Sequence, residues 1–242
     1  MVTLTLKCLH CGSENLVRDG FTPNGKQRYW CHDCNRSSRD NPQPRGYSEA
    51  EKERILAAYE ERSSLRGLER VFGVSRKTVS QWLKKKEAAL PDLSATLVAA
   101  AARVAAELEL DELWSFVFKK SRKRWIWIAL CRGTRQVVAY VIGDRSEATC
   151  QKLWQRLPEV YRAAHCYTDF WEAYQNVIPK SQHTACGKDS GLTAHVERWN
   201  NTLRQRLARF VRKTLSFSKS DRMHEICLRL FIHRYNLSLR PT

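Results

Sequence analysis

Three β-prone segments follow one another in the second half of the chain. Residues 110–118, 125–131 and 136–142 are rich in Leu, Ile, Val and Trp, and short basic or glycine-containing stretches separate them. Strands joined by turns of this length usually pair as neighbours. The pattern therefore predicts three consecutive antiparallel strands.

Apolar residues also recur at helical spacing around these strands. The spacing predicts an amphipathic helix over 146–157 and longer helical stretches over 194–212 and 219–236, with a short strand near 165–168. The Ala-rich stretch 93–108 has no internal glycine or proline and is predicted as a helix that leads into the first strand. This part of the chain is thus a mixed α/β unit.

A helix, a turn and a second helix are predicted over residues 65–84. Gly73 can adopt the positive φ that reverses the chain, Val74 can fill the gap between the helices, and Ser75 can cap the second helix. The outer face of the second helix could enter the major groove of DNA, although a helical hairpin with a solvated basic face is the alternative. The residues of this outer face are Arg76, Lys77, Ser80, Gln81 and Lys84.

Four cysteines form two pairs near the N-terminus. Cys8 and Cys11 make the first CxxC and Cys31 and Cys34 make the second, with residues 12–30 between them. Two such pairs can present four thiolates to one tetrahedral Zn²⁺, and a redox CxxC is the alternative. We expect a small zinc-ribbon-like domain that needs its metal to fold.

Composition divides the chain into successive units. We predict a four-cysteine domain over 1–41, a helix-turn-helix domain over 46–87, a helical linker over 88–107 and the α/β domain over 108–242. Two prolines and a glycine within residues 40–46 predict a flexible connection between the first two domains.

The chain is strongly basic. Its 42 Lys and Arg residues exceed its 25 Asp and Glu residues and give a formal net charge of +17. This excess points to a polyanionic partner, and nucleic acid is the leading candidate. The most apolar stretch, 97–106, is short and contains Arg103, so no membrane partner is predicted. The N-terminus lacks the pattern of a signal peptide, and a cytoplasmic location is expected.

Three acidic residues stand where a metal-dependent site could form. Asp111 lies in the first strand among large apolar residues, where an unpaired charge is costly. Asp169 follows a short strand at its carboxyl end, where the active sites of α/β proteins gather. Glu197 begins a polar stripe on a predicted helix. Carboxylates that hold divalent ions are one way to hydrolyse a phosphodiester.

Each of these acids also has a structural interpretation. Asp169 could cap the helix that follows it, and Glu197 could be an ordinary exposed residue. Glu112 competes with Asp111, because strand alternation places these neighbours on opposite faces and cannot choose between them.

Several stretches of the sequence resemble the insertion sequence 1 family of bacterial and archaeal transposases. The similarity covers both CxxC pairs, the helix-turn-helix, and residues 111–114, 168–171 and 196–200, which carry the Asp, Asp, Glu pattern of the family. The most specific stretch runs from 203–209 through 212–220. The resemblance covers nearly the whole chain.

The resemblance implies an RNase H-like catalytic fold and selects Asp111 over Glu112, with Asp169 and Glu197 completing the site. It implies Mg²⁺ or Mn²⁺ at this triad, cleavage of double-stranded DNA at the terminal inverted repeats of the element, and transfer of the 3′-hydroxyl ends to target DNA. A homodimer or higher homo-oligomer is expected. Basic residues expected to hold DNA phosphates are Arg198, Arg204, Arg209 and Lys213.

Two other functions fit the same residues. A DNA-binding repressor could carry a degenerate nuclease fold, and an RNase H-like nuclease could cut DNA without joining it.

Overall fold

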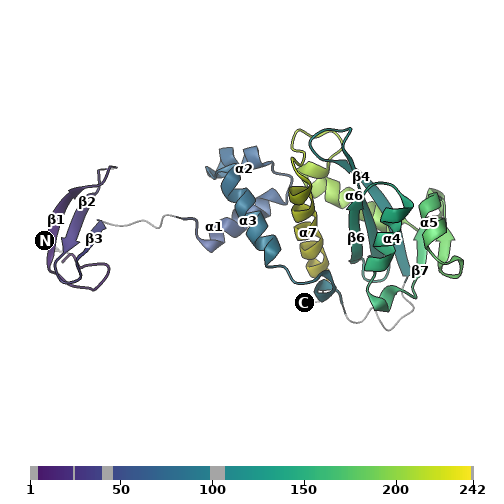
Figure 1. Ribbon diagram of the computed structural model, residues 1–242, viewed down its shortest axis with the longest axis horizontal. Coiled ribbons are helices and arrows are strands. Elements are labelled where there is room, and N and C mark those ends of the chain that lie inside the picture. The colour runs from purple at the N-terminus through teal and green to yellow at the C-terminus, as the bar shows by residue number, and fades with distance from the viewer. Residues whose placement is uncertain (1–4, 24, 40–45, 99–106, 241–242) are drawn as a thin grey trace. The chain divides into compact units, whose positions relative to one another are not determined.

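The computed structural model describes residues 5–23, 25–39, 46–98 and 107–240. These belong to two compact units, which comprise residues 1–49 and residues 50–242 (Figure 1). Most of the predicted connection over 40–46 lies outside the described residues.

The first unit is a three-stranded antiparallel sheet. Strands β1 (Leu16–Phe21), β2 (Gln27–Cys31) and β3 (Arg36–Arg39) pair in chain order. Among the described residues of this unit, only Cys8 and Cys31 are buried. A sheet with so small a core needs an additional source of stability, such as a bound metal.

The second unit contains a five-stranded sheet in the order β6-β5-β4-β7-β8. Strands β4 (Glu107–Phe116), β5 (Lys123–Cys131) and β6 (Val137–Gly143) are antiparallel, which confirms the three consecutive strands predicted from the sequence. Strand β7 (His165–Thr168) pairs with β4 in parallel, and β8 (His183–Ala185) pairs with β7 in parallel.

Helices cover both faces of this sheet. Helices α4 (Glu147–Arg156) and α5 (Glu172–Val177) pack on one face, and α6 (Ala194–Arg206) and α7 (Asp221–Ser238) pack on the other (Figure 1). Helix α4 and the strand near 165–168 occur where the sequence predicts them. No helix within the described ranges is long and apolar enough to span a membrane.

Three helices precede the sheet: α1 (Glu49–Tyr59), α2 (Leu65–Phe72) and α3 (Arg76–Ala88). Gly73, between α2 and α3, has a φ of 66°, in the left-handed region that glycine adopts without strain. The side chain of Ser75 caps α3 by accepting a backbone N–H. The two helices and the turn predicted here are therefore present.

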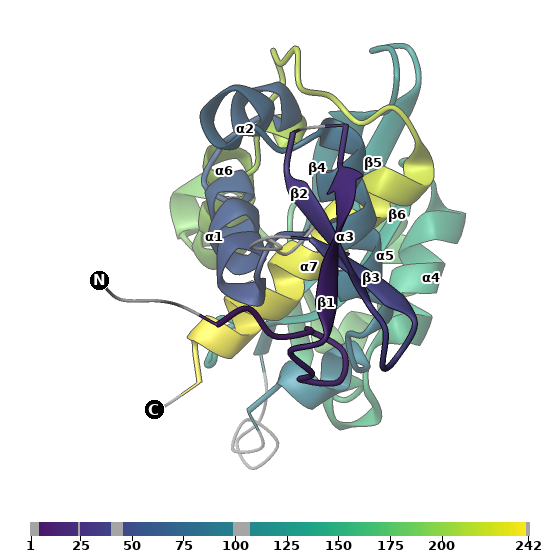
Figure 2. The ribbon, with the colours of Figure 1, turned by 90° about the vertical axis from the view of Figure 1, so that its left-hand side faces the viewer.

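Helix α7 packs against these helices as well as against the sheet. Glu87 of α3 is buried and accepts hydrogen bonds from Arg222 at 2.6 Å and from Arg229 at 2.8 Å, both on α7. In Figure 2, α7 crosses behind α1 and α3. Helices α1–α3 and the sheet thus belong to one compact unit, whereas the sequence suggested separate units.

The helix predicted over 93–108 is not found where the structure describes this stretch. A short 3-10 turn covers Leu93–Thr96, and Leu108 already belongs to β4, while 99–106 lie outside the described residues. The buried side chain of Gln136 accepts the N–H of Val98 at 2.9 Å and donates to the carbonyl of Thr96 at 3.0 Å. These tertiary bonds take backbone groups that a helix would pair internally, and they override alanine propensity.

The helix predicted over 194–212 ends earlier, at Arg206. The carbonyl of Arg206 accepts the N–H of Arg62 at 2.7 Å, and a separate 3-10 turn follows over Ala208–Phe210. The break turns Arg209 inward, where the side chain is buried. Tertiary contacts, and not the local sequence pattern, therefore determine where this helix ends.

Replacing Asn236 with Ala tests the packing of α7 on the sheet. The Asn236 Oδ1 accepts the N–H of Val137 at 2.9 Å, and Nδ2 donates to the carbonyl of Val137 at 2.9 Å. Because the substitution leaves both buried groups unpaired, we expect the free energy of unfolding to fall by about 2–4 kcal/mol. Urea unfolding measures this change, and Ser238→Ala on the exposed side of α7 is the control. Equal midpoints for the two variants would contradict the expectation.

Candidate functional site

Four cysteine sulfurs converge between the loop before β1 and the turn after β2. Cys8 Sγ lies 3.6 Å from Cys34 Sγ, and Cys11 Sγ lies 3.6 Å from Cys31 Sγ. All four sulfurs lie within 4.8 Å of one another. Sulfurs bound at about 2.3 Å to a tetrahedral Zn²⁺ would lie roughly 3.8 Å apart, so this arrangement fits zinc.

The surroundings of these thiols also favour a cation. Backbone N–H groups of His10 and Cys11 lower the pKa of the Cys8 thiol to about 6. Burial and the neighbouring sulfurs raise the pKa of Cys34 to about 12, because charged thiolates repel one another. A bound dication removes this repulsion and holds all four thiols ionised.

A pocket of about 420 Å³ in the second unit brings together the three acids predicted from the sequence, Asp111, Asp169 and Glu197. The parallel pairing of β4 with β7 sets Tyr167 beside Glu109. Parallel strands run in the same direction, so Asp169, two residues after Tyr167, lies level with Asp111, two residues after Glu109. Three separate parts of the chain therefore meet at one end of the short strand β7.

Asp111 faces helix α6 from the middle of β4. Its Oδ2 accepts a hydrogen bond from Asn200 Nδ2 at 2.7 Å. Burial, together with the nearby charges of Asp169 and Glu197, raises the pKa of Asp111 to about 6 despite the lowering effect of the hydrogen bond from Asn200. An amide that donates to Asp111 must turn its oxygen away, and this Asn200 Oδ1 is buried without a hydrogen-bond partner among the described residues.

Glu112 lines the same pocket from the opposite face of β4. Its carboxylate accepts hydrogen bonds from Arg145 Nε at 2.7 Å and Tyr174 Oη at 2.8 Å. Burial and the charge of Asp169 raise the pKa of Glu112 to about 7. Oxygens of Glu112, Asp111 and Asp169 lie within 4.8 Å of one another, close enough to share one ion. Geometry alone thus keeps Glu112 as a competitor, although both of its oxygens already have partners.

Asp169 and Glu197 keep more of their oxygens available. Asp169 Oδ1 accepts the N–H of Trp171 at 3.0 Å, which fixes the turn before α5. Glu197 Oε1 accepts the hydroxyl of Thr193 at 3.2 Å. Asp169 therefore orders the turn before α5 rather than capping the helix. Within the described chain, no Arg or Lys forms an ion pair with Asp169 or Glu197.

Glu109 fixes the start of α6, although sequence reasoning did not single it out. Its side chain is fully buried, and Oε2 accepts the N–H groups of His195 at 2.8 Å and Val196 at 2.9 Å. Arg132 Nε lies 3.1 Å from the other oxygen. Helix α6 has no side-chain cap of its own. Glu109 supplies the missing acceptor in the same first turn of α6 that carries Glu197.

Basic side chains line the pocket beside the acids. Arg145 stacks on Trp171 with 3.9 Å between the guanidinium carbon and the ring centroid, and it lies 4.8 Å from the ring of Trp125. Arg204 and Arg212 also line the pocket. The Nε of Arg204 is buried and has no hydrogen-bond partner in the described part of the chain. Such a group can bind an anion that enters the pocket.

Comparison with known proteins identifies the family. The family model of the IS1 transposase matches residues 104–237, and the model of the InsA N-terminal domain matches residues 1–35. The chain belongs to the IS1 transposase family. This confirms the family resemblance of the sequence, and the N-terminal match is to a zinc ribbon.

Each of three relatives is similar to about half of the chain. The iso-IS1n protein InsB of Shigella dysenteriae is 39% identical over 127 residues, which are 52% of this chain and 94% of that protein. The IS1 protein InsB of Shigella flexneri is 40% identical over 48% of this chain and 86% of its own length. The IS1 4 protein InsB of Escherichia coli K12 is 39% identical over 48% of this chain and 68% of its own length.

The basic residues expected at DNA fall into different environments in this IS1-family chain. Arg198 and Lys213 are exposed, and Arg204 lines the pocket. Arg209 is buried and donates to Tyr59 Oη at 2.6 Å and Ser218 Oγ at 3.0 Å. The expectation that Arg209 holds a DNA phosphate is therefore corrected: its donors serve internal packing.

The outer face of α3 is exposed as the helical spacing predicts. Arg76, Lys77, Gln81 and Lys84 are exposed, and Arg76 pairs with Glu69 at 3.0 Å. Ser80 is half-buried, and its hydroxyl donates to the carbonyl of Arg76 at 2.8 Å.

Magnesium should stabilise the protein more at high pH than at low pH. Asp111 and Glu112 have pKa values of about 6 and about 7 in the folded chain, against about 4 in an unfolded chain. Between about pH 4 and about pH 7 the folded chain therefore binds more protons than the unfolded chain. The free energy of unfolding falls as pH rises through this window. A divalent ion bound to the ionised acids offsets that loss.

Thermal unfolding with and without added Mg²⁺, at about pH 8 and about pH 5, measures the difference. We expect a larger Mg²⁺-induced rise in Tm at the higher pH, and a reduced rise in Asp111→Asn. An equal rise at both pH values would exclude metal binding at these acids.

Replacing Glu109 with Gln should weaken metal binding, because Glu109 holds the start of the helix that carries Glu197. The amide removes the charge that holds the first N–H groups of α6, so the helix start is less firmly fixed. We expect Mn²⁺ affinity to fall by roughly tenfold, measured by the electron paramagnetic resonance of free Mn²⁺. Glu107→Gln, at the exposed start of the same strand, should bind Mn²⁺ like the unsubstituted protein. Unchanged affinity in Glu109→Gln would show that α6 is positioned by other contacts.

Proposed function

We propose that this chain is a DNA transposase that binds the terminal inverted repeats of its element, cuts the strand ends by metal-dependent hydrolysis, and joins the 3′-hydroxyl ends to target DNA. The observation that carries the proposal is the convergence of Asp111, Asp169 and Glu197 in one pocket of an IS1-family chain. The basic lining of that pocket and the net charge of +17 suit a DNA substrate.

An RNase H-like fold is the architecture we propose for the α/β part. The sheet has three antiparallel strands followed by two parallel ones, which supports this assignment. Asp111 lies on the first strand of this sheet, Asp169 directly follows the fourth, and Glu197 lies on a later helix. Three separate parts of the chain thereby supply one acid each.

Asp111, Asp169 and Glu197 are the residues that would hold Mg²⁺ or Mn²⁺. The bound ions would neutralise phosphate charge and make the attacking oxygen more nucleophilic. We favour Asp111 over Glu112 because the oxygens of Glu112 are occupied by Arg145 and Tyr174. Asn200 orients the Asp111 carboxylate through its amide N–H, and its buried Oδ1 remains available as a further acceptor in the site.

The basic residues of the pocket would hold the DNA strand against the acids. Arg204 and Arg212 line the pocket, and the buried Nε of Arg204 has no hydrogen-bond partner among the described residues. Both can bind phosphate oxygens, while exposed Arg198 and Lys213 extend the contact beyond the pocket. Arg145 has a different role, since it neutralises Glu112 and is held between two tryptophans.

Recognition of the element ends is proposed for the N-terminal parts of the chain. The exposed face of α3 would enter the major groove, with Lys77 and Gln81 toward the bases. Cys8, Cys11, Cys31 and Cys34 would hold Zn²⁺ and so fold the first unit. A homodimer or higher oligomer on the DNA remains part of the proposal.

Substituting each acid by its amide tests the cutting step. We expect Asp111→Asn, Asp169→Asn and Glu197→Gln to lower Mg²⁺-dependent nicking of a duplex of the element end by at least about a thousandfold. DNA affinity should persist and should weaken steeply with salt, because phosphate contacts release counterions. Gel assays of nicking and binding at several salt concentrations measure both.

The matched control is Glu112→Gln, which changes an acid of the same pocket and should retain most of the nicking. Loss of nicking in Glu112→Gln alone would move the site to that residue. Binding without nicking by the unsubstituted protein would favour a repressor, and nicking without joined products would favour a nuclease.

A further inference from the structure

Leu215 is almost completely exposed, at 99% of its surface, in the loop between α6 and α7. An apolar side chain without protein contacts adds nothing to folding stability. A second large apolar residue, Phe118, is 61% exposed at the tip of the β4–β5 hairpin. The loop and the hairpin protrude at the same end of the sheet, at the top of Figures 1 and 2. This end therefore presents two apolar side chains to a partner.

The base of the Leu215 loop is firmly held. Phe217 packs on Phe116 with ring centroids 5.6 Å apart. The carbonyl of Ser218 accepts the N–H of Phe118 at 2.8 Å, so the loop and the hairpin are joined at their bases. Leu215 therefore lies two residues before Phe217, whose packing on Phe116 anchors this part of the loop.

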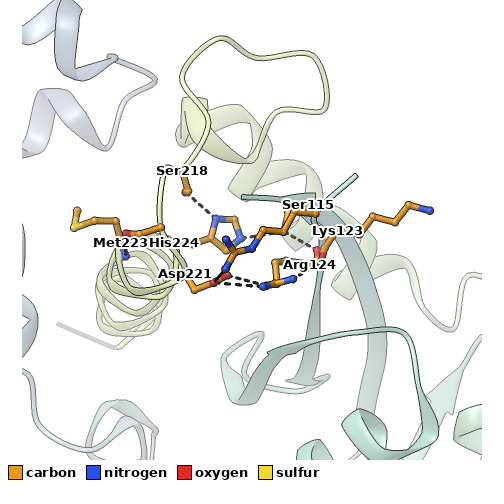
Figure 3. Close-up of polar contacts among 9 residues, drawn as sticks. Ser115, Lys123, Arg124, Ser218, Asp221, Met223 and His224 are labelled. Carbon is orange, nitrogen blue, oxygen red and sulfur yellow. Dashed lines mark hydrogen bonds and ion pairs between the residues drawn. The ribbon is translucent and has the colours of Figure 1, made fainter. Parts of the chain in front are cut away.

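Buried hydrogen bonds fix Ser218 further (Figure 3). Ser115 donates to the carbonyl of Arg124 at 2.7 Å, so its oxygen must accept from His224 Nε2, which lies 3.0 Å away. His224 Nδ1 then accepts from the hydroxyl of Ser218 at 2.8 Å. Asp221 at the start of α7 pairs with Arg124 at 2.7 Å. Hydrogen bonds and an ion pair therefore connect the hairpin strands, the base of the loop and α7.

The surroundings of Leu215 select a polyanion as the partner. Exposed basic residues flank it in the loop and occupy the hairpin. Arg122 of the hairpin pairs with Asp221, whereas five others form no ion pair within the described chain. The five are Arg212 and Lys213 in the loop and Lys119, Lys120 and Lys123 in the hairpin. A partner protein would need a matching acidic surface around an apolar pocket, whereas duplex DNA offers phosphates beside stacked bases.

The distance to the acid pocket locates the contact on the DNA. Arg212 lines the pocket, and Leu215 follows it by three residues. At about 3.3 Å per extended residue, the Cα atoms of Arg212 and Leu215 lie at most about 10 Å apart. This separation corresponds to roughly three base-pair steps of duplex DNA.

We propose that Leu215 inserts between base pairs of the DNA duplex, a few steps from the phosphate that Arg212 binds at the acid pocket. The insertion opens the stack and gives the acids access to a strand held by the flanking cations. The proposal rests on the proposed DNA substrate and adds a residue that distorts this substrate.

Fluorescence of 2-aminopurine tests the insertion, because this base brightens when it is unstacked. The probe is a duplex of the element end with 2-aminopurine placed at successive positions on both sides of the mapped nick. The Asp111→Asn background prevents cutting during the measurement. We expect several-fold brightening at one position, loss of this signal in Leu215→Ala, and its retention in Leu215→Phe, where a large apolar side chain remains.

The matched control is Val160→Ala, which truncates another apolar side chain with 59% exposure. It should leave the signal unchanged, and the salt dependence of binding should be the same in all variants. Brightening that persists in Leu215→Ala would overturn the insertion. A change of oligomeric state in Leu215→Ala with an unchanged signal would also overturn it and assign Leu215 to a contact between copies. Failure of the Asp111→Asn parent to bind DNA would instead overturn the proposed function.

Discussion

The buried carboxylate of Glu109 holds helix α6 on strand β4 at the point where both elements carry their acids. It accepts the first N–H groups of α6, which has no side-chain cap of its own. Asp111 lies two residues along the strand and Glu197 lies in the first turn of the helix. This contact therefore sets the spacing between two of the three acids. The positions of Arg204 and Asn200 depend on it, because both residues also come from α6.

A second set of buried polar contacts joins the N-terminal helices to the same sheet. Tyr59 of α1 accepts from Arg209, which donates to Ser218, and Ser218 is bonded to His224 of α7. His224 in turn reaches Ser115 on β4, four residues beyond Asp111. Burial lowers the pKa of His224 to about 3, which keeps the ring neutral and able to connect two hydroxyls. The proposed DNA-binding helices and the acid pocket thus share a rigid core.

Local patterns predicted much of this arrangement, and contacts between distant residues account for the rest. Strand periodicity, helix spacing and the turn at Gly73 depend on neighbouring residues, and the structure contains them. The Ala-rich segment and the basic side chain of Arg209 were misinterpreted, because Gln136 and Tyr59 reach them from far along the chain. The role of Glu109 was missed for the same reason, although an acid between two buried leucines was a usable signal.

Crystals soaked with Mn²⁺ test most directly whether an ion binds between Asp111, Asp169 and Glu197. We expect an anomalous-scattering peak coordinated by oxygens of these three residues, with Glu112 still bonded to Arg145 and Tyr174. A peak coordinated by Glu112 in place of Glu197, or no peak among these acids at saturating Mn²⁺, would show that the three acids do not form the metal site.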